Sequence, residues 1–137
     1  MESLIVRALN ENDYDDILVG WWSQWNWKAP SKDFLPDNGK GGLMVLDNDV
    51  PVCAGFLYIT NSKVSWVDWI ISSREYNKKP HRKEAIKLLV ASLTEISKRS
   101  GNKYAFALIK NSSLINTYEN LGYVKGDSYT SEMIKTL

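Results

Sequence analysis

Three strand-like runs separated by two short polar turns constrain the fold of this chain more than any other feature. The runs cover residues 43–46, 52–59 and 64–71, and the turns between them cover residues 47–49 and 61–63. Runs rich in β-branched and aromatic residues that are joined by such short turns are typical of antiparallel hairpins. The middle of the chain is therefore predicted to form a three-strand antiparallel meander.

A long helix and a further strand are expected after the meander. The apolar residues that recur there at helical spacing are Ala85, Leu88, Leu89, Leu93 and Ile96. We then expect a strand over residues 104–109, a helix over residues 112–120 and a last strand over residues 128–134. Because a strand that returns to a sheet through a helix joins it in parallel, the sequence predicts a mixed α/β sheet with helices on both faces.

The N-terminal third is predicted to supply one strand and one helix. Residues 4–9 read as the strand, and Asn10 stands where a helix N-cap belongs, with acidic residues in the turn after it. The residues predicted to form the apolar face of this helix are Tyr14, Ile17, Leu18, Trp21 and Trp25. Residues 26–42 are rich in proline, glycine and asparagine, which favours a loop with one short helix near residues 31–35.

The composition indicates one globular domain over residues 1–137 and narrows the class of partner. Lys and Arg number 17 and Asp and Glu number 16, a balance that argues against a protein built to bind nucleic acid. Cys53 is the single cysteine, which excludes an internal disulfide and fits a reducing compartment. It is expected to be a buried, inert thiol. The sequence shows neither a signal-peptide pattern nor an apolar run of membrane length, and a cytoplasmic location is expected.

Residues 111–123, NSSLINTYENLGY, carry the most specific motif in the chain. A polar turn at Asn111 leads into a short amphipathic helix that contains Tyr118 and ends at Gly122 and Tyr123. Directly after a strand, this pattern resembles the second acetyl-CoA-side motif of the GNAT superfamily of N-acetyltransferases. The order of elements is also similar to that superfamily over essentially the whole chain. The resemblance implies the GNAT-like acyl-CoA N-acyltransferase fold, an antiparallel meander followed by a βαβ crossover.

The resemblance implies that acetyl-CoA binds where the fourth strand parts from the strand after the long helix. It assigns contacts with the pantetheine arm to Ile70, Ile71 and Ser72, and further contacts to Asn111 and Ser113. From the residues alone, the end of the fourth strand also reads as an ordinary central strand, and Asn111 as a helix cap.

The expected phosphate-binding loop departs from the superfamily pattern. Glycines in this loop normally let backbone N–H groups approach a pyrophosphate, but this chain has Pro80, Lys83 and Ala85 there, and only Ala85 fits. The basic side chains nearby are Lys78, Lys79, Arg82 and Lys83. We expect them to hold the phosphates as point charges. The alternative is a solvated basic surface on a protein that no longer binds coenzyme A. Similar glycine-poor loops occur in GNAT-like proteins from phage genomes.

The same resemblance supplies two candidate catalytic residues. Tyr118 is the candidate acid that protonates the departing thiolate, and Asp68 is the candidate base that takes a proton from the acceptor amine. Side chains alternate along a strand, which predicts that Asp68 shares a face with Trp66, Ile70 and Ser72. Burial between tryptophans would raise the pKa of this carboxyl. The plainer alternatives are a packed tyrosine whose hydroxyl bonds elsewhere, and an aspartate that is salt-bridged or faces solvent.

Aromatic residues in the first helix and the loop after it are candidates for the acceptor side. Trp21 and Trp25 lie on the predicted apolar face and read as core residues. Trp22 and Trp27 lie off that face, and with Phe34 they are expected to line an acceptor pocket or a protein contact.

The sequence thus predicts an N-acetyltransferase that moves an acetyl group from acetyl-CoA directly to an amine of a small molecule or protein, without a metal. A cytoplasmic enzyme is expected, in the host cytoplasm if the gene is a phage's. The resemblance is compatible with a homodimer and gives no reason to expect a membrane partner. Two other classes stay open. One is a binding protein that kept the fold and lost the donor site, and the other is an enzyme of this fold that uses another donor or modifies a nucleotide.

Overall fold

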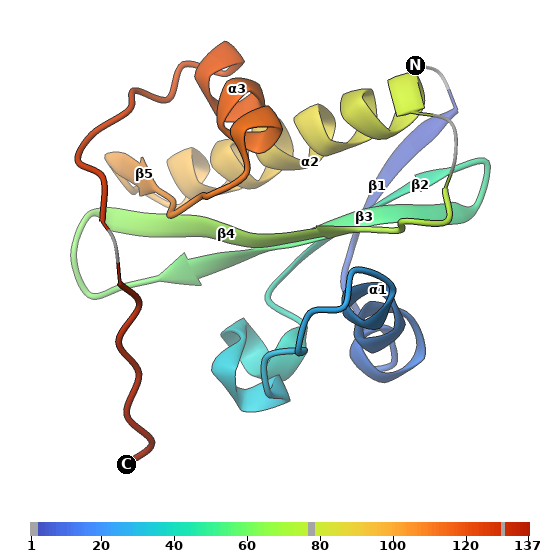
Figure 1. Cartoon of the computed structure of the whole chain (residues 1–137). Helices are drawn as coiled ribbons and strands as arrows, with labels where there is room; N and C mark the ends of the chain where they lie inside the picture. Colours follow the sequence, from blue (N-terminus) through green and yellow to red (C-terminus); the bar gives the residue numbers. More distant parts are fainter. Residues whose placement is uncertain (1–2, 77–78, 130) are drawn as a thin grey trace.

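The computed structural model describes residues 3–76, 79–129 and 131–137 and contains one five-stranded sheet (Figure 1). Its strands are β1 (Leu4–Ala8), β2 (Gly42–Asp47), β3 (Val50–Ile59), β4 (Val64–Ser72) and β5 (Tyr104–Phe106). They lie side by side in chain order, antiparallel from β1 to β4, and β5 pairs with β4 in parallel. The predicted meander, crossover and mixed α/β sheet are confirmed.

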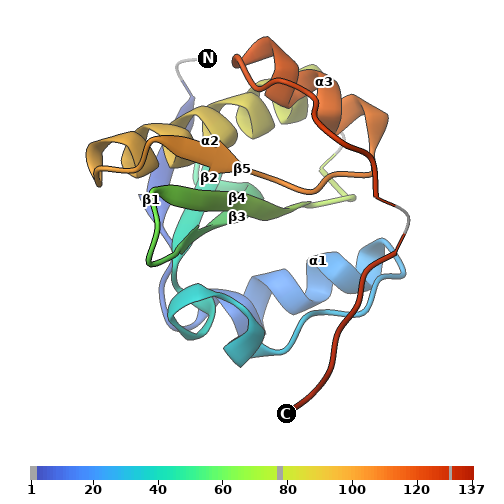
Figure 2. The same ribbon diagram turned by 90° about the vertical axis from the view of Figure 1, so that its left-hand side faces the viewer.

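Helices cover both faces of this sheet. In Figure 1, α2 (Lys79–Arg99) and α3 (Ser112–Asn120) lie above it, and α1 (Val19–Gln24) lies below it. A π-helical segment, η1 (Tyr14–Leu18), leads directly into α1, and two short 3-10 helices, η2 (Lys32–Phe34) and η3 (Pro36–Gly39), follow on the same side. Figure 2 shows the same three layers after a turn of 90°.

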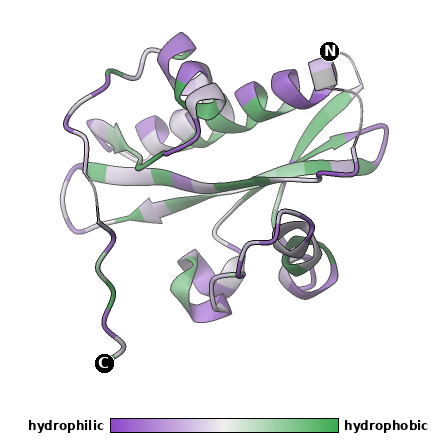
Figure 3. Ribbon diagram, viewed as in Figure 1, coloured by the Kyte–Doolittle hydropathy of each residue, from purple (hydrophilic) through white to green (hydrophobic). Residues whose placement is uncertain are grey.

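Apolar side chains fill both gaps between the layers. Green, hydrophobic stretches run along the strands that supply them (Figure 3). The cluster under α2 and α3 includes Val45, Val67, Leu89, Leu93 and Tyr118. The cluster against α1 includes Leu18, Trp22, Met44, Phe56 and Ile71. Neighbouring residues of β2, Met44 and Val45, enter opposite clusters because side chains alternate along a strand.

The first helix begins where it was predicted but turns differently. The side-chain oxygen of Asn10 accepts the backbone N–H groups of Asn12 and Asp13, which confirms Asn10 as a cap. Each π-helical turn in η1 closes over one more residue than an α-turn does, which rotates the residues that follow away from α-helical spacing. Trp22 is consequently buried, 3% exposed, beside Trp21. The prediction that Trp22 lies off the apolar face is wrong for this reason.

A bulge in β4 breaks the alternation that the sequence predicted. Trp69 and Ile70 together stand opposite the single residue Gly55 of β3, and Trp69 has a positive φ of 56°. As a result, Ile70 packs towards α2 whereas Trp69 packs in the cluster on the α1 side. The prediction that Asp68 and Ile70 share a face is therefore wrong. The bulge places two residues of β4 opposite one residue of β3, which shifts the alternation of side chains between Asp68 and Ile70.

Two predicted strand boundaries at the C-terminal end are also wrong. β5 ends at Phe106 instead of residue 109, because β4 and the chain after β5 stop pairing there. Residues 128, 129 and 131–134 form no strand, although a strand was predicted over 128–134. These residues are exposed and have no neighbouring strand within the described part of the chain, so no ladder forms.

Gly55→Ala is expected to destabilise the protein by about 1–3 kcal/mol, because an added Cβ would lie 2.5 Å from Ile70 Cδ1 and 3.1 Å from Leu93 Cδ1. Chemical denaturation followed by tryptophan fluorescence measures the change. The matched control is Gly20→Ala in α1, where nothing lies within 4 Å of an added Cβ and the helix should gain about 0.5–1 kcal/mol. Equal stability of the two variants would contradict the packing described at the bulge.

Candidate functional site

The pairing of β4 and β5 is short, and the two segments part before β4 ends. The paired residues are Val64, Ser65 and Trp66 of β4 with Tyr104, Ala105 and Phe106 of β5. β4 then continues to Ser72, while residues 107–110 belong to no strand. We call the gap between residues 67–72 and residues 107–110 the splay. Within the described residues, no strand pairs with this side of β4 beyond Trp66.

Two side chains supply hydrogen bonds that the missing strand would have made. The Tyr118 hydroxyl donates to the Val67 carbonyl oxygen at 2.7 Å. On the facing segment, the Leu108 N–H donates to Asp68 Oδ2 at 3.2 Å. The Trp69 N–H donates to Asp68 Oδ1 at 2.9 Å. A phenol and a carboxylate thus satisfy backbone groups where β4 and β5 separate.

Burial governs the electrostatics of Asp68. It raises the pKa of the carboxyl above its usual range, and the hydrogen bonds from the Trp69 and Leu108 N–H groups offset only part of that rise. The predicted upward shift of this pKa is confirmed. The partners of the carboxylate oxygens are backbone N–H groups, which hold it in one orientation.

Tyr118 lies at the same place but is buried. Its side chain is 2% exposed, and its ring packs edge-to-face on Tyr123 at 4.9 Å between centroids. Burial raises the pKa of the phenol, with smaller contributions from the charges of Asp68 and Tyr123, so the hydroxyl stays protonated at neutral pH. In this structure Tyr118 is a packed tyrosine with a satisfied hydroxyl, and its role as an acid stays a prediction.

The motif over residues 111–123 explains how Tyr118 is positioned. Asn111 Oδ1 accepts the Leu114 N–H at 3.0 Å and caps α3, which confirms the capping interpretation. Gly122, at a φ of 94°, ends the helix, and the Tyr123 N–H then bonds the Tyr118 carbonyl at 3.1 Å. Contact of Asn111 with a donor stays a prediction, as does contact of Ser113, which is exposed in the first turn of α3.

Solved acetyltransferase structures share this architecture. A GNAT family acetyltransferase from Staphylococcus aureus superposes with a TM-score of 0.63 at 17% identity, covering 96% of this chain and 99% of that chain. Glucosamine-6-phosphate N-acetyltransferase from Arabidopsis thaliana gives 0.64 at 10% identity over 96% and 99% of the two chains. An aminoglycoside acetyltransferase from an uncultured soil sample gives 0.61 at 11% identity over 99% and 97%.

The chain has the GNAT acetyltransferase fold. The likeness holds for the fold, since the sequences are only 10–17% identical to these three structures. No protein-family model matches the sequence. No curated protein matches it either.

α2 begins within the segment that the resemblance assigned to a phosphate-binding loop. α2 begins at Lys79, with Pro80 in its first turn, where a missing N–H costs nothing. Ala85, in the second turn of α2, is fully buried in the core between this helix and the sheet. The side chain of Ala85 packs in the core, so only its backbone could serve a phosphate, and the assignment of Ala85 to the donor site stays a prediction.

Two of the basic residues near the start of α2, Arg82 and Lys83, differ in exposure and in hydrogen bonding. Lys78 lies outside the described residues, and Lys79 is the first residue of α2. Arg82 is half-buried and its Nη2 donates to the Tyr76 carbonyl oxygen at 2.8 Å. Lys83 is exposed in the second turn of α2. Phosphate binding by these residues stays a prediction.

The residues assigned to the pantetheine arm lie at the end of β4. Ile71 is buried in the cluster against α1, and Ile70 packs towards α2. The Ser72 carbonyl oxygen accepts the indole N–H of Trp25 at 2.8 Å. Only backbone groups of Ile70 and Ile71 could therefore serve a ligand in the splay, since both side chains belong to the core.

The aromatic residues predicted for an acceptor wall separate into two groups. Trp22 and Phe34 both meet Trp69 edge-on, with ring centroids 6.4 and 5.8 Å apart. Trp27 instead stacks on Trp25 at 5.5 Å. Phe34 and Trp27 are partly exposed. The contacts of Trp69 with both Trp22 and Phe34 were not predicted. The orientation of Trp69 depends on the bulge, and no local pattern in the sequence indicates the bulge.

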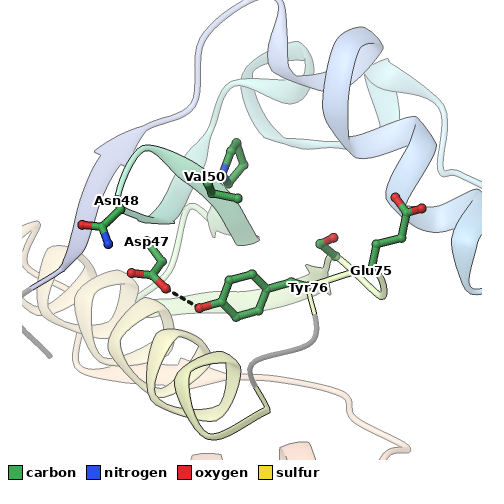
Figure 4. Close-up of a pocket in the computed structure, with 7 residues that line it drawn as sticks. Asp47, Asn48, Val50, Glu75 and Tyr76 are labelled. Carbon is green, nitrogen blue, oxygen red and sulfur yellow. Dashed lines mark hydrogen bonds between the residues drawn. The ribbon is translucent and has the colours of Figure 1, made fainter.

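A pocket that the sequence did not point to lies beside the turn between β2 and β3 (Figure 4). It encloses about 370 Å³ and is lined by Asp47, Asn48, Val50, Pro51, Ser73, Glu75 and Tyr76. The Tyr76 hydroxyl donates to Asp47 Oδ2, and His81 Nδ1 lies 3.4 Å from the same oxygen. Burial and the bond to Asp47 raise the pKa of Tyr76 to about 12. None of these lining residues is among the predicted site residues.

Cys53 is buried in β3, as predicted, and burial raises the pKa of its thiol, which disfavours the reactive thiolate. Among the described residues, no group of three or more His, Cys, Asp or Glu side chains could hold a metal ion. The described helices include none long and apolar enough to cross a membrane.

Asp68→Asn is expected to become more stable, relative to the unsubstituted protein, as the pH rises. The folded-state pKa of Asp68 is raised, so its stabilising contribution is complete below the ordinary value of about 4 and is lost as the pH rises through the folded value. Asparagine does not ionise and avoids that loss. Urea denaturation of both proteins at about pH 4 and about pH 7 measures the difference. A difference that does not change with pH would contradict the burial of this carboxyl.

Proposed function

We propose that this protein is an N-acetyltransferase that binds acetyl-CoA in the splay and transfers the acetyl group directly to an amine. The observation that carries the proposal is the parting of β4 and β5. There the Tyr118 hydroxyl bonds Val67 O, and the Asp68 carboxylate bonds Leu108 N. An extended pantetheine arm has amide groups that can take over such bonds as an added strand does. The structural neighbours named for glucosamine-6-phosphate and aminoglycosides support an amine as the acceptor.

The two groups at the splay suit the two proton transfers of this reaction. The amine nitrogen attacks the thioester carbonyl carbon, a C–N bond forms and the C–S bond breaks. Tyr118 gives its phenolic proton to the leaving thiolate, and Asp68, directly or through a water, takes the proton that the amine loses. The raised pKa of Tyr118 keeps the phenol protonated, and the raised pKa of Asp68 makes its carboxylate a better proton acceptor.

Donor binding also has to free the Tyr118 hydroxyl from the backbone. The hydroxyl donates to Val67 O in the unliganded protein. An N–H group of the pantetheine arm can replace it at this carbonyl, because both are hydrogen-bond donors. The phenol would then be available to the thioester sulfur. Binding and activation of the acid are therefore coupled in this proposal.

The phosphates of the donor would lie near the start of α2. Its N-terminal end carries the positive end of the helix dipole. The basic side chains assigned to them are Lys78, Lys79, Arg82 and Lys83. Arg82 already bonds the Tyr76 carbonyl, which leaves part of its guanidinium for an anion.

A second candidate function is a binding protein that has lost acetyl transfer. Two observations favour it: the Tyr118 hydroxyl is satisfied by the backbone, and the start of α2 lacks glycines. Its contact surface would include the exposed rings of Trp27 and Phe34. The two candidates differ in whether acetyl-CoA binds at all.

Tyr118→Phe is expected to leave the Kd for acetyl-CoA within about threefold of the unsubstituted protein while turnover falls at least about tenfold, because general acid catalysis typically contributes more than that. Calorimetric titration measures binding, and release of free thiol from acetyl-CoA with a panel of amines measures turnover. Tyr129→Phe, at an exposed ring, is the matched control and should change neither. Equal turnover of Tyr118→Phe and the unsubstituted protein would remove Tyr118 from the mechanism.

Lys83→Gln is expected to weaken acetyl-CoA binding about two- to fivefold at low salt and less at high salt, because an exposed cation contributes a screened attraction to phosphate. Calorimetry at two salt concentrations measures the effect. Lys98→Gln, an exposed lysine at the far end of α2, should leave binding unchanged. Equal losses from both substitutions would show that general charge, and not the start of α2, attracts the donor.

A further inference from the structure

The end of α1 is hydrogen-bonded to the segment that follows β4. We call residues 73–76 the connecting segment, which leads from β4 towards α2 and forms neither helix nor strand. The Trp25 indole N–H donates to the Ser72 carbonyl oxygen at 2.8 Å, just before this segment. Arg74 Nη1 donates to the Gln24 carbonyl oxygen at 3.1 Å, and the Arg74 guanidinium lies 5.4 Å from the centre of the Trp25 ring. Residues 50 positions apart in the chain are therefore joined on the α1 side of the sheet.

The Gln24 carboxamide adds two bonds to the same segment. Its Oε1 accepts the Arg74 backbone N–H at 2.8 Å, and its Nε2 donates to Glu75 Oε1 at 2.8 Å. Glu75 extends towards the blue ribbon of α1 in Figure 4. A backbone N–H can only donate and a carboxylate can only accept, so the two partners require one acceptor and one donor at the end of this side chain. Glutamine meets that requirement, whereas an ionised glutamate lacks the donor.

The connecting segment in turn orients a cation of the proposed phosphate site. The Tyr76 carbonyl oxygen accepts Arg82 Nη2 at 2.8 Å. Among the described residues, this carbonyl is the one group that accepts a hydrogen bond from Arg82, since the buried Nε has no partner there. The direction of the guanidinium therefore depends on where the Tyr76 backbone lies. The bond from the Tyr76 hydroxyl to Asp47 anchors the ring, and Gln24 anchors the two residues just before it.

We propose that Gln24 is a positioning residue for donor binding: it holds the connecting segment where the Tyr76 carbonyl orients Arg82 towards the donor phosphates. The inference rests on the donor site proposed above. The start of α2 lacks glycines, so its grip on phosphate has to come from long basic side chains. Such side chains have many rotamers, and fixing one of them improves binding only if its surroundings hold it. Gln24 supplies that hold from the opposite face of the sheet, without touching the donor.

Gln24→Glu tests this role, because it keeps an acceptor for the Arg74 N–H but places a second carboxylate beside that of Glu75. We expect acetyl-CoA binding to weaken about three- to tenfold, a size common for the coupling of side chains in one hydrogen-bond network. S-acetylpantetheine carries the thioester arm without phosphates, and its Kd should change by less than about twofold, since Gln24 makes no contact with the splay. Calorimetry measures the first Kd, and an amide NMR titration measures the second.

Exchanging the two side chains is the matched rescue. In Gln24→Glu combined with Glu75→Gln, a carboxylate accepts the Arg74 N–H and a carboxamide donates to that carboxylate, so both bonds return with no added charge. The double variant should recover the acetyl-CoA Kd to within about twofold of the unsubstituted protein. Ser23→Ala, at an exposed neighbour in α1, should change neither Kd. Urea denaturation of each variant establishes that binding is measured on folded protein.

Three results would overturn the role of Gln24 and leave the donor site in place. Gln24→Glu could bind acetyl-CoA as tightly as the unsubstituted protein does. It could lose acetyl-CoA and S-acetylpantetheine to the same extent, as a general loosening of the fold would cause. The exchanged pair could also fail to recover the affinity. If the unsubstituted protein does not bind acetyl-CoA at all, the proposed function itself is wrong, and the role of Gln24 is wrong with it.

Discussion

The Asp68 carboxylate holds together the part of the sheet on which the site depends. One oxygen accepts the N–H of Trp69, the residue with positive φ, and the other accepts the N–H of Leu108 across the splay. A non-glycine residue in such a conformation costs about 1–3 kcal/mol and persists only where its surroundings fix it. The same carboxylate therefore stabilises the bulge and bridges the splay, although its own burial disfavours its charge.

The bulge and the splay together explain why residues from both layers meet at one place. Tyr118 reaches Val67 from the α3 side of the sheet, while Trp69 packs with Phe34 and Trp22 on the α1 side. In the proposed reaction the donor lies between these layers. It would meet the phenol from one side, and the acceptor would approach from the aromatic side. The fold alone does not establish acetyl transfer, because the activity depends on the side chains at the site.

Local signals in the sequence predicted the fold and much of α3, while features that depend on distant contacts were missed. Turns and apolar periodicity predicted the meander and the long helix, and Asn111 and Gly122 predicted the ends of α3 because caps are local. The bulge was missed because it rests on the approach of Ile70 to Gly55 and on the bond from Leu108 to Asp68, 40 residues apart. The π-helical turn of η1, which buries Trp22, likewise has no signature in apolar spacing.

The most direct test of the donor site is an amide NMR titration of the isotope-labelled protein with acetyl-CoA. If the pantetheine arm takes over the bonds in the splay, the largest shifts should fall on the N–H groups of residues 67–70 and of Leu108, whose bond to Asp68 must change. Shifts confined to the pocket lined by Asp47 and Tyr76, or no shifts at millimolar acetyl-CoA, would contradict a donor site between β4 and β5.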